Sequence, residues 1–187
     1  KFQLKQEFDL SIAIFDENYF RDNKKIHASG SYFYDDYINE LKFLLKIAHH
    51  NKKLALVFKS QFMYNTIFNL SKKNQELEKL CDHNQIFNIF YSNNHNERNV
   101  VTPAEIAQSV DLSLSSTMGG TAGYEALSVG CRTIFVKSML SSYDDIFPQN
   151  LLLDKVEDLE KLLLKIEYSR ENLFKTDIGE KLNLDDF

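Results

Sequence analysis

The run DLSLSSTMGGTAGYEALSVGCRTIFVK, residues 111–137, decides the fold of this 187-residue chain. It holds two short stretches that suit strands, 112–115 and 133–136, on either side of a stretch at 121–129 that suits a helix. Each of the two is too short for a helix and is predicted to be a buried strand. A strand, a helix and a second strand in this order indicate two parallel strands joined by a crossover helix.

The same alternation of strands and helices extends along most of the chain. Further strands are predicted at 9–15, 54–58, 86–91 and 151–153, and further helices at 35–50, 64–80, after 102, and from 154 to about 166. The alternation favours an α/β fold: a doubly wound, Rossmann-like parallel sheet of about six strands with helices on both faces. Residues 1–187 are expected to form one domain, with 169–187 as a C-terminal tail.

Two of the expected helices carry a capping signal. Thr102, Pro103 and Glu105 combine a capping threonine, a proline at the first helical position and a glutamate three residues after the cap. Asp154 and Glu157 resemble such a signal at the start of the last long helix. Both helices are therefore expected to begin at these residues.

Composition excludes several classes of function. Lys and Arg number 22 against 27 Asp and Glu, a net charge of −5, so the chain has no overall positive field to hold nucleic acid. Cys81 and Cys131 show no zinc-ligand spacing, so neither a disulfide framework nor a metal site is expected, and a reducing cytoplasm is the default location. The sequence contains no run of 18 apolar residues and no signal peptide. Since the chain begins at Lys1 rather than Met, a fragment of a longer protein is one interpretation.

Glycine is concentrated in the run that decides the fold. Four of the 6 glycines fall between 119 and 130. Ser115, Ser116 and Thr117 provide hydroxyls where the strand ends, and Gly119, Gly120 and Thr121 then turn the chain into a helix. In doubly wound sheets ligands bind at this end of the strands.

The first N–H groups of that helix have no partner within it, and together with the helix dipole they favour an anion such as a diphosphate. Glu125 lies about one turn inside the helix, where its carboxylate can accept hydrogen bonds from both hydroxyls of a ribose. The alternative is a plain glycine-rich connection, with Thr121 as the helix cap and Glu125 as an exposed acid.

The run resembles the donor-binding half of GT-B glycosyltransferases, and more loosely the UDP-sugar 2-epimerases and polyglycerol-phosphate transferases. The matching residues are Asp111, Ser115, Ser116, Gly119, Gly120, Thr121, Glu125, Ala126, Leu127, Gly130 and Ile134. The close match is short, and the order of strands and helices extends the likeness over most of the chain.

The resemblance implies a role for each matching position. The loop from Ser116 to Thr121, which includes Thr117, Gly119 and Gly120, would contact the donor diphosphate, and Glu125 the ribose. The strand end at Phe90 and Tyr91, followed by Ser92, would read the nucleobase through its main chain. Lys59, after the second strand, would stabilise the leaving nucleoside diphosphate by its charge; an exposed strand end is the alternative for Lys59.

The sequence also departs from the pattern of this family. Ser60 and Gln61 stand where related phosphotransferases often have His-Pro, so no base is implied there. Only Glu125 is present where retaining members have two glutamates. A GT-B enzyme has two Rossmann-like domains with the active site between them, and 187 residues supply one.

These observations predict the donor-binding half of a glycosyltransferase that moves a sugar from a nucleotide diphosphate sugar to a hydroxyl in surface polysaccharide synthesis. The expected partners are the nucleotide-sugar and an N-terminal acceptor-binding domain, with no cofactor and no metal. The expected location is the cytoplasm, with peripheral membrane association through the full-length protein as a further option. The alternatives are half of a nucleotide-sugar epimerase, half of a polyol-phosphate transferase, or a non-enzymatic module that binds a partner.

Overall fold

The computed structural model describes residues 7–15, 19–20, 32–63, 66–92, 99–117, 121–137, 147 and 149–179. Its main sheet has six strands, all of them parallel: β1 (Leu10–Phe15), β4 (Leu54–Lys59), β5 (Ile86–Ile89), β6 (Leu112–Ser116), β7 (Arg132–Val136) and β8 (Leu152–Leu153). The helices are α2 (Tyr34–His50), α3 (Ile67–Ser71), α4 (Gln75–Cys81), α5 (Pro103–Ala107), α6 (Thr121–Ser128), α7 (Asp158–Lys165) and α8 (Arg170–Phe174), with a short 3₁₀ turn, η3 (Gln149–Leu151). Strands β2 (Tyr19–Phe20) and β3 (Tyr32–Phe33) form a separate two-stranded sheet.

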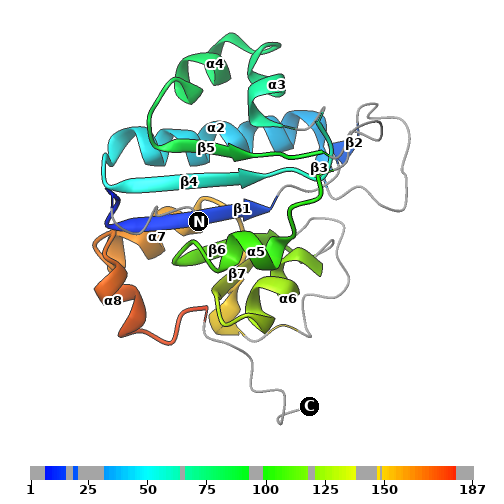
Figure 1. Cartoon of the computed structure of the whole chain (residues 1–187). Helices are drawn as coiled ribbons and strands as arrows, with labels where there is room; N and C mark the ends of the chain where they lie inside the picture. The colour runs from blue at the N-terminus through cyan, green and yellow to red at the C-terminus, as the bar shows by residue number, and fades with distance from the viewer. Residues whose placement is uncertain are drawn as a thin grey trace.

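The order of the strands confirms the predicted doubly wound fold. Across the sheet the order is β5-β4-β1-β6-β7-β8, so the chain builds outward from β1 on one side and then outward from β6 on the other. Figure 1 shows this sheet lying between two layers of helices. The direction of winding reverses between β1 and β6, which is the place where open α/β sheets bind ligands.

Apolar side chains from both faces of the strands form the core. On one face, Ile12, Leu56 and Leu114 pack in a cluster with residues of α2 and α7. On the other face, Ala13 and Val57 pack with residues of α5 and with Ala126 of α6. Because neighbouring residues of a strand point to opposite faces, a sheet covered on both sides buries every residue of its central strands, including the serines of β6.

Helix α2 shows why these segments adopt their structures. Its buried residues recur every three or four positions, as in Tyr37, Leu41 and Leu44, and form one apolar stripe on the sheet. Asp35 and Asp36 lie in the first turn, where a negative charge is favoured by the helix dipole. This helix confirms the one expected at 35–50.

The capping signals had different outcomes. At α5 the prediction is confirmed: the Glu105 N–H donates to Thr102 Oγ1 at 3.2 Å, and the Thr102 N–H donates to Glu105 Oε2 at 2.7 Å. The Thr102 N–H and, at 3.0 Å, the Thr102 hydroxyl both donate to Glu105 Oε2, and these two bonds lower the pKa of the Glu105 carboxyl. At α7 the prediction is wrong, because Glu157 makes no capping bond and the Asp154 carboxylate pairs instead with Lys137 at 2.6 Å.

The helix expected at 64–80 is divided into α3 and α4. The division falls at Asn74, whose side-chain oxygen accepts hydrogen bonds from the N–H groups of Glu76 and Leu77 at 3.1 and 3.2 Å. An asparagine in this position starts a new helix rather than continuing the previous one. The strand expected at 86–91 ends earlier, at Ile89.

Candidate functional site

The parallel sheet brings most of the predicted site residues to one edge. All six strands have their carboxyl ends at this edge, which we call the carboxyl edge. Ser116 ends β6 and Thr117 follows it, while Lys59 ends β4. Tyr91 and Ser92 follow β5 within three residues of its end. The fold therefore places all of these residues at the carboxyl edge, with Ser116 and Thr117 next to the point where the winding reverses.

Helix α6 begins at this edge with Thr121, which is exposed. Gly119 and Gly120, expected to bind the diphosphate, lie outside the described residues. Glu125 is exposed one turn inside α6, and no polar partner of its carboxylate is found in the part of the chain that the structure describes. Its carboxylate is thus accessible to a ligand at the start of the helix.

Gly123 allows α6 to pack closely on the sheet. A Cβ atom at this position would lie 2.5 Å from the ring of Phe135 and 2.9 Å from the Cβ of Ser115. Only a residue without a side chain fits at such distances. The glycine therefore brings the first turn of α6 down onto the ends of β6 and β7.

The hydroxyl of Ser115 is buried beneath this helix without a hydrogen-bond partner. Within the described ranges, Ser115 Oγ and Asn88 Oδ1 are the buried side-chain atoms that lack one. The neighbouring Ser113, two residues earlier on the same strand, bonds to Thr133 Oγ1 at 2.7 Å. Buried polar groups in proteins are nearly always paired, so this hydroxyl is an exception that lies directly beneath the first turn of α6.

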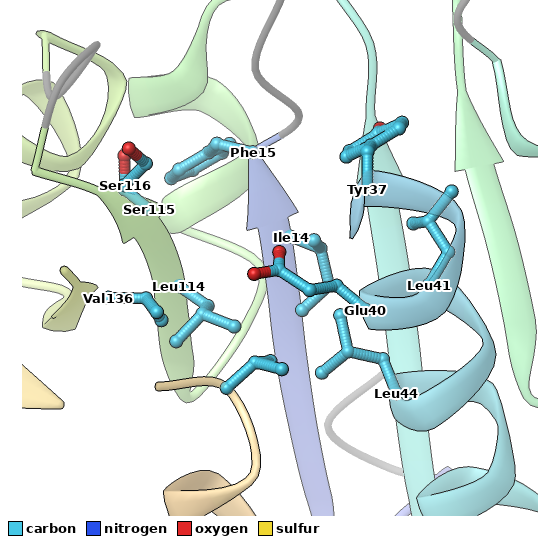
Figure 2. Close-up of a pocket in the computed structure, with 11 residues that line it drawn as sticks. Ile14, Phe15, Tyr37, Glu40, Leu41, Leu44, Leu114, Ser115, Ser116 and Val136 are labelled. Carbon is cyan, nitrogen blue, oxygen red and sulfur yellow. The ribbon is translucent and has the colours of Figure 1, made fainter. Parts of the chain in front are cut away.

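A pocket lies at the reversal point between β1, β6 and α2. Its volume of about 30 Å³ leaves room for about two water molecules, so it is too small for a sugar or a nucleotide. Figure 2 shows the Glu40 carboxylate extending from α2 over β1, with Ser116 across the pocket. The lining residues are Ile14, Phe15, Tyr37, Glu40, Leu41, Leu44, Leu114, Ser115, Ser116, Val136 and Val156.

Two charged residues at this edge were not predicted from the sequence. Glu40 lies three residues after Tyr37 and four before Leu44, so it lies beside the buried stripe of α2. An acid at this position on the helix is the sequence signal that could have indicated it. Lys137 follows β7 as Lys59 ends β4, and its Nζ is 2.6 Å from Asp154. Thr117 donates its N–H to the Val136 carbonyl at 3.0 Å, which places Lys137 beside the end of β6.

Lys59 is half-buried and lies two strands away from β6. Its register partners are Phe15 of β1 and Ile89 of β5. Since strands lie about 4.8 Å apart, the main chains of β4 and β6 are separated by roughly 10 Å. A long lysine side chain can therefore approach a ligand that lies over β1, between these two strands.

After β5, some main-chain N–H and C=O groups are hydrogen-bonded and others are not. Tyr91 donates its N–H to Asn99 Oδ1 at 3.2 Å and accepts at its carbonyl from the Val100 N–H at 2.8 Å. The main chain of Phe90 makes no hydrogen bond among the described residues. The residue Tyr91 is 61% exposed. Of the predicted base-reading segment, Phe90 thus presents free main-chain groups and Tyr91 an exposed ring.

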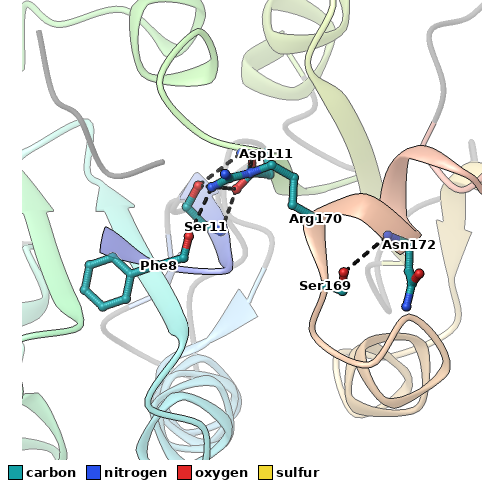
Figure 3. A network of polar contacts seen from close by, with 6 residues as sticks. All are labelled: Phe8, Ser11, Asp111, Ser169, Arg170 and Asn172. Carbon is teal, nitrogen blue, oxygen red and sulfur yellow. Dashed lines mark hydrogen bonds and ion pairs between the residues drawn. The ribbon is translucent and has the colours of Figure 1, made fainter. Parts of the chain in front are cut away.

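Asp111, which belongs to the resembling run, lies at the opposite edge. Its carboxylate accepts from the Ser11 N–H at 2.9 Å and from Arg170 Nε at 2.6 Å (Figure 3). Arg170 also donates to the carbonyl of Phe8 at 3.1 Å. Asp111 therefore joins strands and helix α8, and it is too far from the carboxyl edge to touch a ligand there.

This contact also defines the start of the segment expected as a tail. Within 169–187, the described part contains α8, and Leu173 of this helix is completely buried. Ser169 caps the helix by accepting from the Asn172 N–H at 3.4 Å. The segment 169–179 therefore packs on the domain, and 180–187 lie outside the described residues.

No three His, Cys, Asp or Glu side chains among the described residues come together as ligands for a metal ion. Of the helices that the structure describes, none is both long enough and apolar enough to cross a membrane.

Comparison with known proteins identifies the fold. No protein-family model matches the sequence, and no curated protein matches it either. The chain is similar in structure to the C-terminal domain of a glycosyl transferase group 1 family protein (LpcC) from Francisella tularensis, with a TM-score of 0.58, 13% identity and coverage of 96% of this chain and 86% of that one. The fold is thus the Rossmann-like fold of one half of a GT-B architecture.

A second similar structure is a protein assigned as a UDP-N-acetylglucosamine 2-epimerase from Listeria monocytogenes. The TM-score is 0.50 at 13% identity, with 95% of this chain matched. This chain covers 42% of the length of that protein. The two comparisons therefore agree on the fold, and the activity is a separate question.

Proposed function

We propose that this chain is the donor-binding domain of a GT-B glycosyltransferase, and that its carboxyl edge binds a nucleotide diphosphate sugar. One observation carries the proposal: α6 begins beside the reversal point of the sheet, with the exposed carboxylate of Glu125 one turn inside it. Helix starts of this kind favour phosphate groups, and carboxylates favour vicinal hydroxyls.

In this proposal different residues bind different parts of the nucleotide-sugar. The start of α6, with Gly119, Gly120 and Thr121, binds the diphosphate together with Ser116 and Thr117. Glu125 binds the ribose. Phe90, Tyr91 and Ser92 receive the base at the end of β5.

The proposed reaction exchanges one bond at the sugar. The oxygen of an acceptor hydroxyl forms a bond to C1 of the sugar, and the bond from C1 to the diphosphate oxygen breaks. The hydroxyl proton passes to a base that the acceptor-binding half supplies. Lys59 and the dipole of α6 stabilise the negative charge that develops on the leaving diphosphate. No cofactor takes part in this scheme.

The proposed setting is the synthesis of a surface polysaccharide in the cytoplasm. It rests on the resemblance of residues 111–134 to the donor-binding half of the glycosyltransferases. Within this proposal a second domain carries the acceptor, and the full-length protein associates peripherally with the inner face of the membrane.

Calorimetry with UDP, GDP and CMP tests the proposal. The chain is expected to bind at least one of them weakly, and Glu125→Ala is expected to lower that affinity by about tenfold or more, since two hydrogen bonds to a charged group are lost. Glu78→Ala is the matched control, because Glu78 is an equally exposed acid on α4, away from the carboxyl edge. It should leave the affinity unchanged.

Two outcomes would contradict the proposal. One is that none of the three nucleotides binds at millimolar concentration. The other is that Glu125→Ala binds as tightly as the unmodified chain, which would favour a module that uses this edge for a protein partner.

A further inference from the structure

The carboxamide of Asn99 uses all of its hydrogen-bonding capacity at the end of β5. Its Nδ2 donates to the carbonyls of Ser60 at 2.9 Å and Ile89 at 2.8 Å. Its Oδ1 accepts from the N–H groups of Tyr91 at 3.2 Å and Val101 at 3.1 Å. An asparagine amide offers two donors and one oxygen with two acceptor sites, so each is occupied.

These bonds connect three segments that are distant in the sequence. They join the end of β4, the end of β5 and the residue that precedes the Thr102 cap of α5. The main chain adds a further link, because the Asn99 N–H donates to the Gln61 carbonyl at 2.8 Å. Asn99 is only 9% exposed, so its bonds are largely shielded from water.

Neither an acid nor an apolar side chain can replace this arrangement. Aspartate has the acceptors but no donor, and its charge would face the carbonyls of Ser60 and Ile89. Alanine or leucine would leave two carbonyls and two N–H groups without their side-chain partner. The shape of the chain after β5 therefore depends on an amide at this position.

The segment that Asn99 holds is the one proposed to receive the base. It fixes Ile89 and Tyr91, which stand on either side of Phe90, whose main chain has no hydrogen bond among the described residues. It also holds the main chain that carries the exposed side chain of Tyr91. Three strand spacings, about 14 Å, separate β5 from β6, the scale of an extended nucleoside diphosphate.

We propose that Asn99 is a positioning residue for the nucleoside part of the donor: it holds the main chain at Phe90 and the ring of Tyr91 where the base binds. It does not contact the diphosphate, which binds three strands away. The inference rests on the proposed function and adds which residue determines the shape of the base site.

The test compares two ligands on the same protein. The affinity of the whole chain is measured for UDP or GDP, whichever the unmodified chain binds more tightly, and for inorganic pyrophosphate. Asn99→Ala is expected to lower the affinity for the nucleotide by about tenfold or more, because the main-chain groups of the base site lose their fixed positions. The affinity for pyrophosphate is expected to stay within about twofold.

Asn74→Ala is the matched control, and Asn99→Asp is a second variant at the same position. Asn74→Ala also removes an asparagine oxygen that accepts from two main-chain N–H groups, at the start of α4, and should change neither affinity. Asn99→Asp keeps the acceptor for Tyr91 and Val101 but loses both donors, so it gives the same pattern if the alanine variant does not fold. Hydrogen exchange of the Tyr91 and Val101 amides should be faster in Asn99→Ala, with the amides of α6 unchanged.

The outcomes separate this inference from the proposed function. If the unmodified chain binds no nucleotide, both fail. If it binds a nucleotide and the Asn99 variants bind it equally well, the inference alone is overturned. An equal loss of nucleotide and pyrophosphate affinity would also overturn it, because Asn99 would then support the whole domain rather than the base site.

Discussion

Buried polar groups at the two edges of the sheet differ in their hydrogen bonding. At the amino edge, where the strands begin, Asp111 is paired with Ser11 and Arg170. The buried Gln85 at the same edge donates to the carbonyls of Ala48 and Leu54 at 3.1 and 2.9 Å. In the carboxyl halves of β6 and β5, Ser115 Oγ and Asn88 Oδ1 have no partner among the described residues. Unpaired buried groups cost stability, so their presence at one edge needs a reason.

Under the proposed function, the groups that stabilise the fold lie at the amino edge and the groups available to a ligand lie at the carboxyl edge. Polar groups at the amino edge hold strands and helices together. Polar groups at the carboxyl edge include several that remain available, among them the Glu125 carboxylate and the Phe90 main chain. Asn99 combines both roles, because its fully paired side chain holds the segment in which the Phe90 main chain has no hydrogen bond among the described residues.

The largest expected effect is at the amino edge. Arg170→Met leaves the Asp111 carboxylate, whose side chain is fully buried, without its positive partner, and should lower the free energy of unfolding by about 3 kcal/mol. Urea denaturation measures this. Lys175→Met, which removes an exposed pair with Glu171 on the same helix, is the control and should change stability little. Equal stabilities for the two variants would remove the distinction between the edges.

A smaller effect is expected where α6 packs on the carboxyl edge. Gly123→Ala places a methyl group against Phe135 and Ser115, so α6 should move away from the sheet at a cost of about 1–3 kcal/mol in unfolding free energy. The nucleotide affinity should fall as well, because the start of α6 shifts. Combining this change with Phe135→Leu should give less than the sum of the two losses. Strict additivity would contradict the packing argument.

The smallest expected effect distinguishes the paired Ser113 from the unpaired Ser115 within strand β6. Ser113→Ala breaks the bond to Thr133 Oγ1 and should cost about 1 kcal/mol of unfolding free energy. Ser115→Ala removes a hydroxyl that has no partner, so stability should stay the same or rise slightly. If the hydroxyl serves the ligand, the second variant alone should bind nucleotide more weakly. Thermal unfolding and calorimetry on the two variants measure both quantities.

Much of the fold could be predicted from local patterns. The helix at 35–50, the strands at 9–15 and 54–58 and the Thr102 capping box depend on residues close together in sequence, and all are observed. The helix division at Asn74 and the wrong capping assignment at Asp154 have one cause: a polar side chain near a helix start can bond to several partners. Which partner is near depends on the fold, as the Lys137 pair with Asp154 shows.

The candidate site was predictable in part. Ser116, Thr117 and Glu125 stood out because they flank a glycine cluster, and the fold places them at the reversal point of the sheet. Glu40 and Lys137 come to this edge from distant segments, and only strand order brings them there. Asn99 lay in a polar stretch with nothing to distinguish it from its neighbours.

The sequence by itself determined the kinds of elements and their order, because hydrophobic periodicity and capping act over a few residues. It also marked one helix start as suited to an anion. Only the tertiary structure decided which polar groups are paired and which are free. That choice depends on contacts between residues 100 or more positions apart, such as Ser11 with Asp111 and Phe8 with Arg170, which no local pattern records.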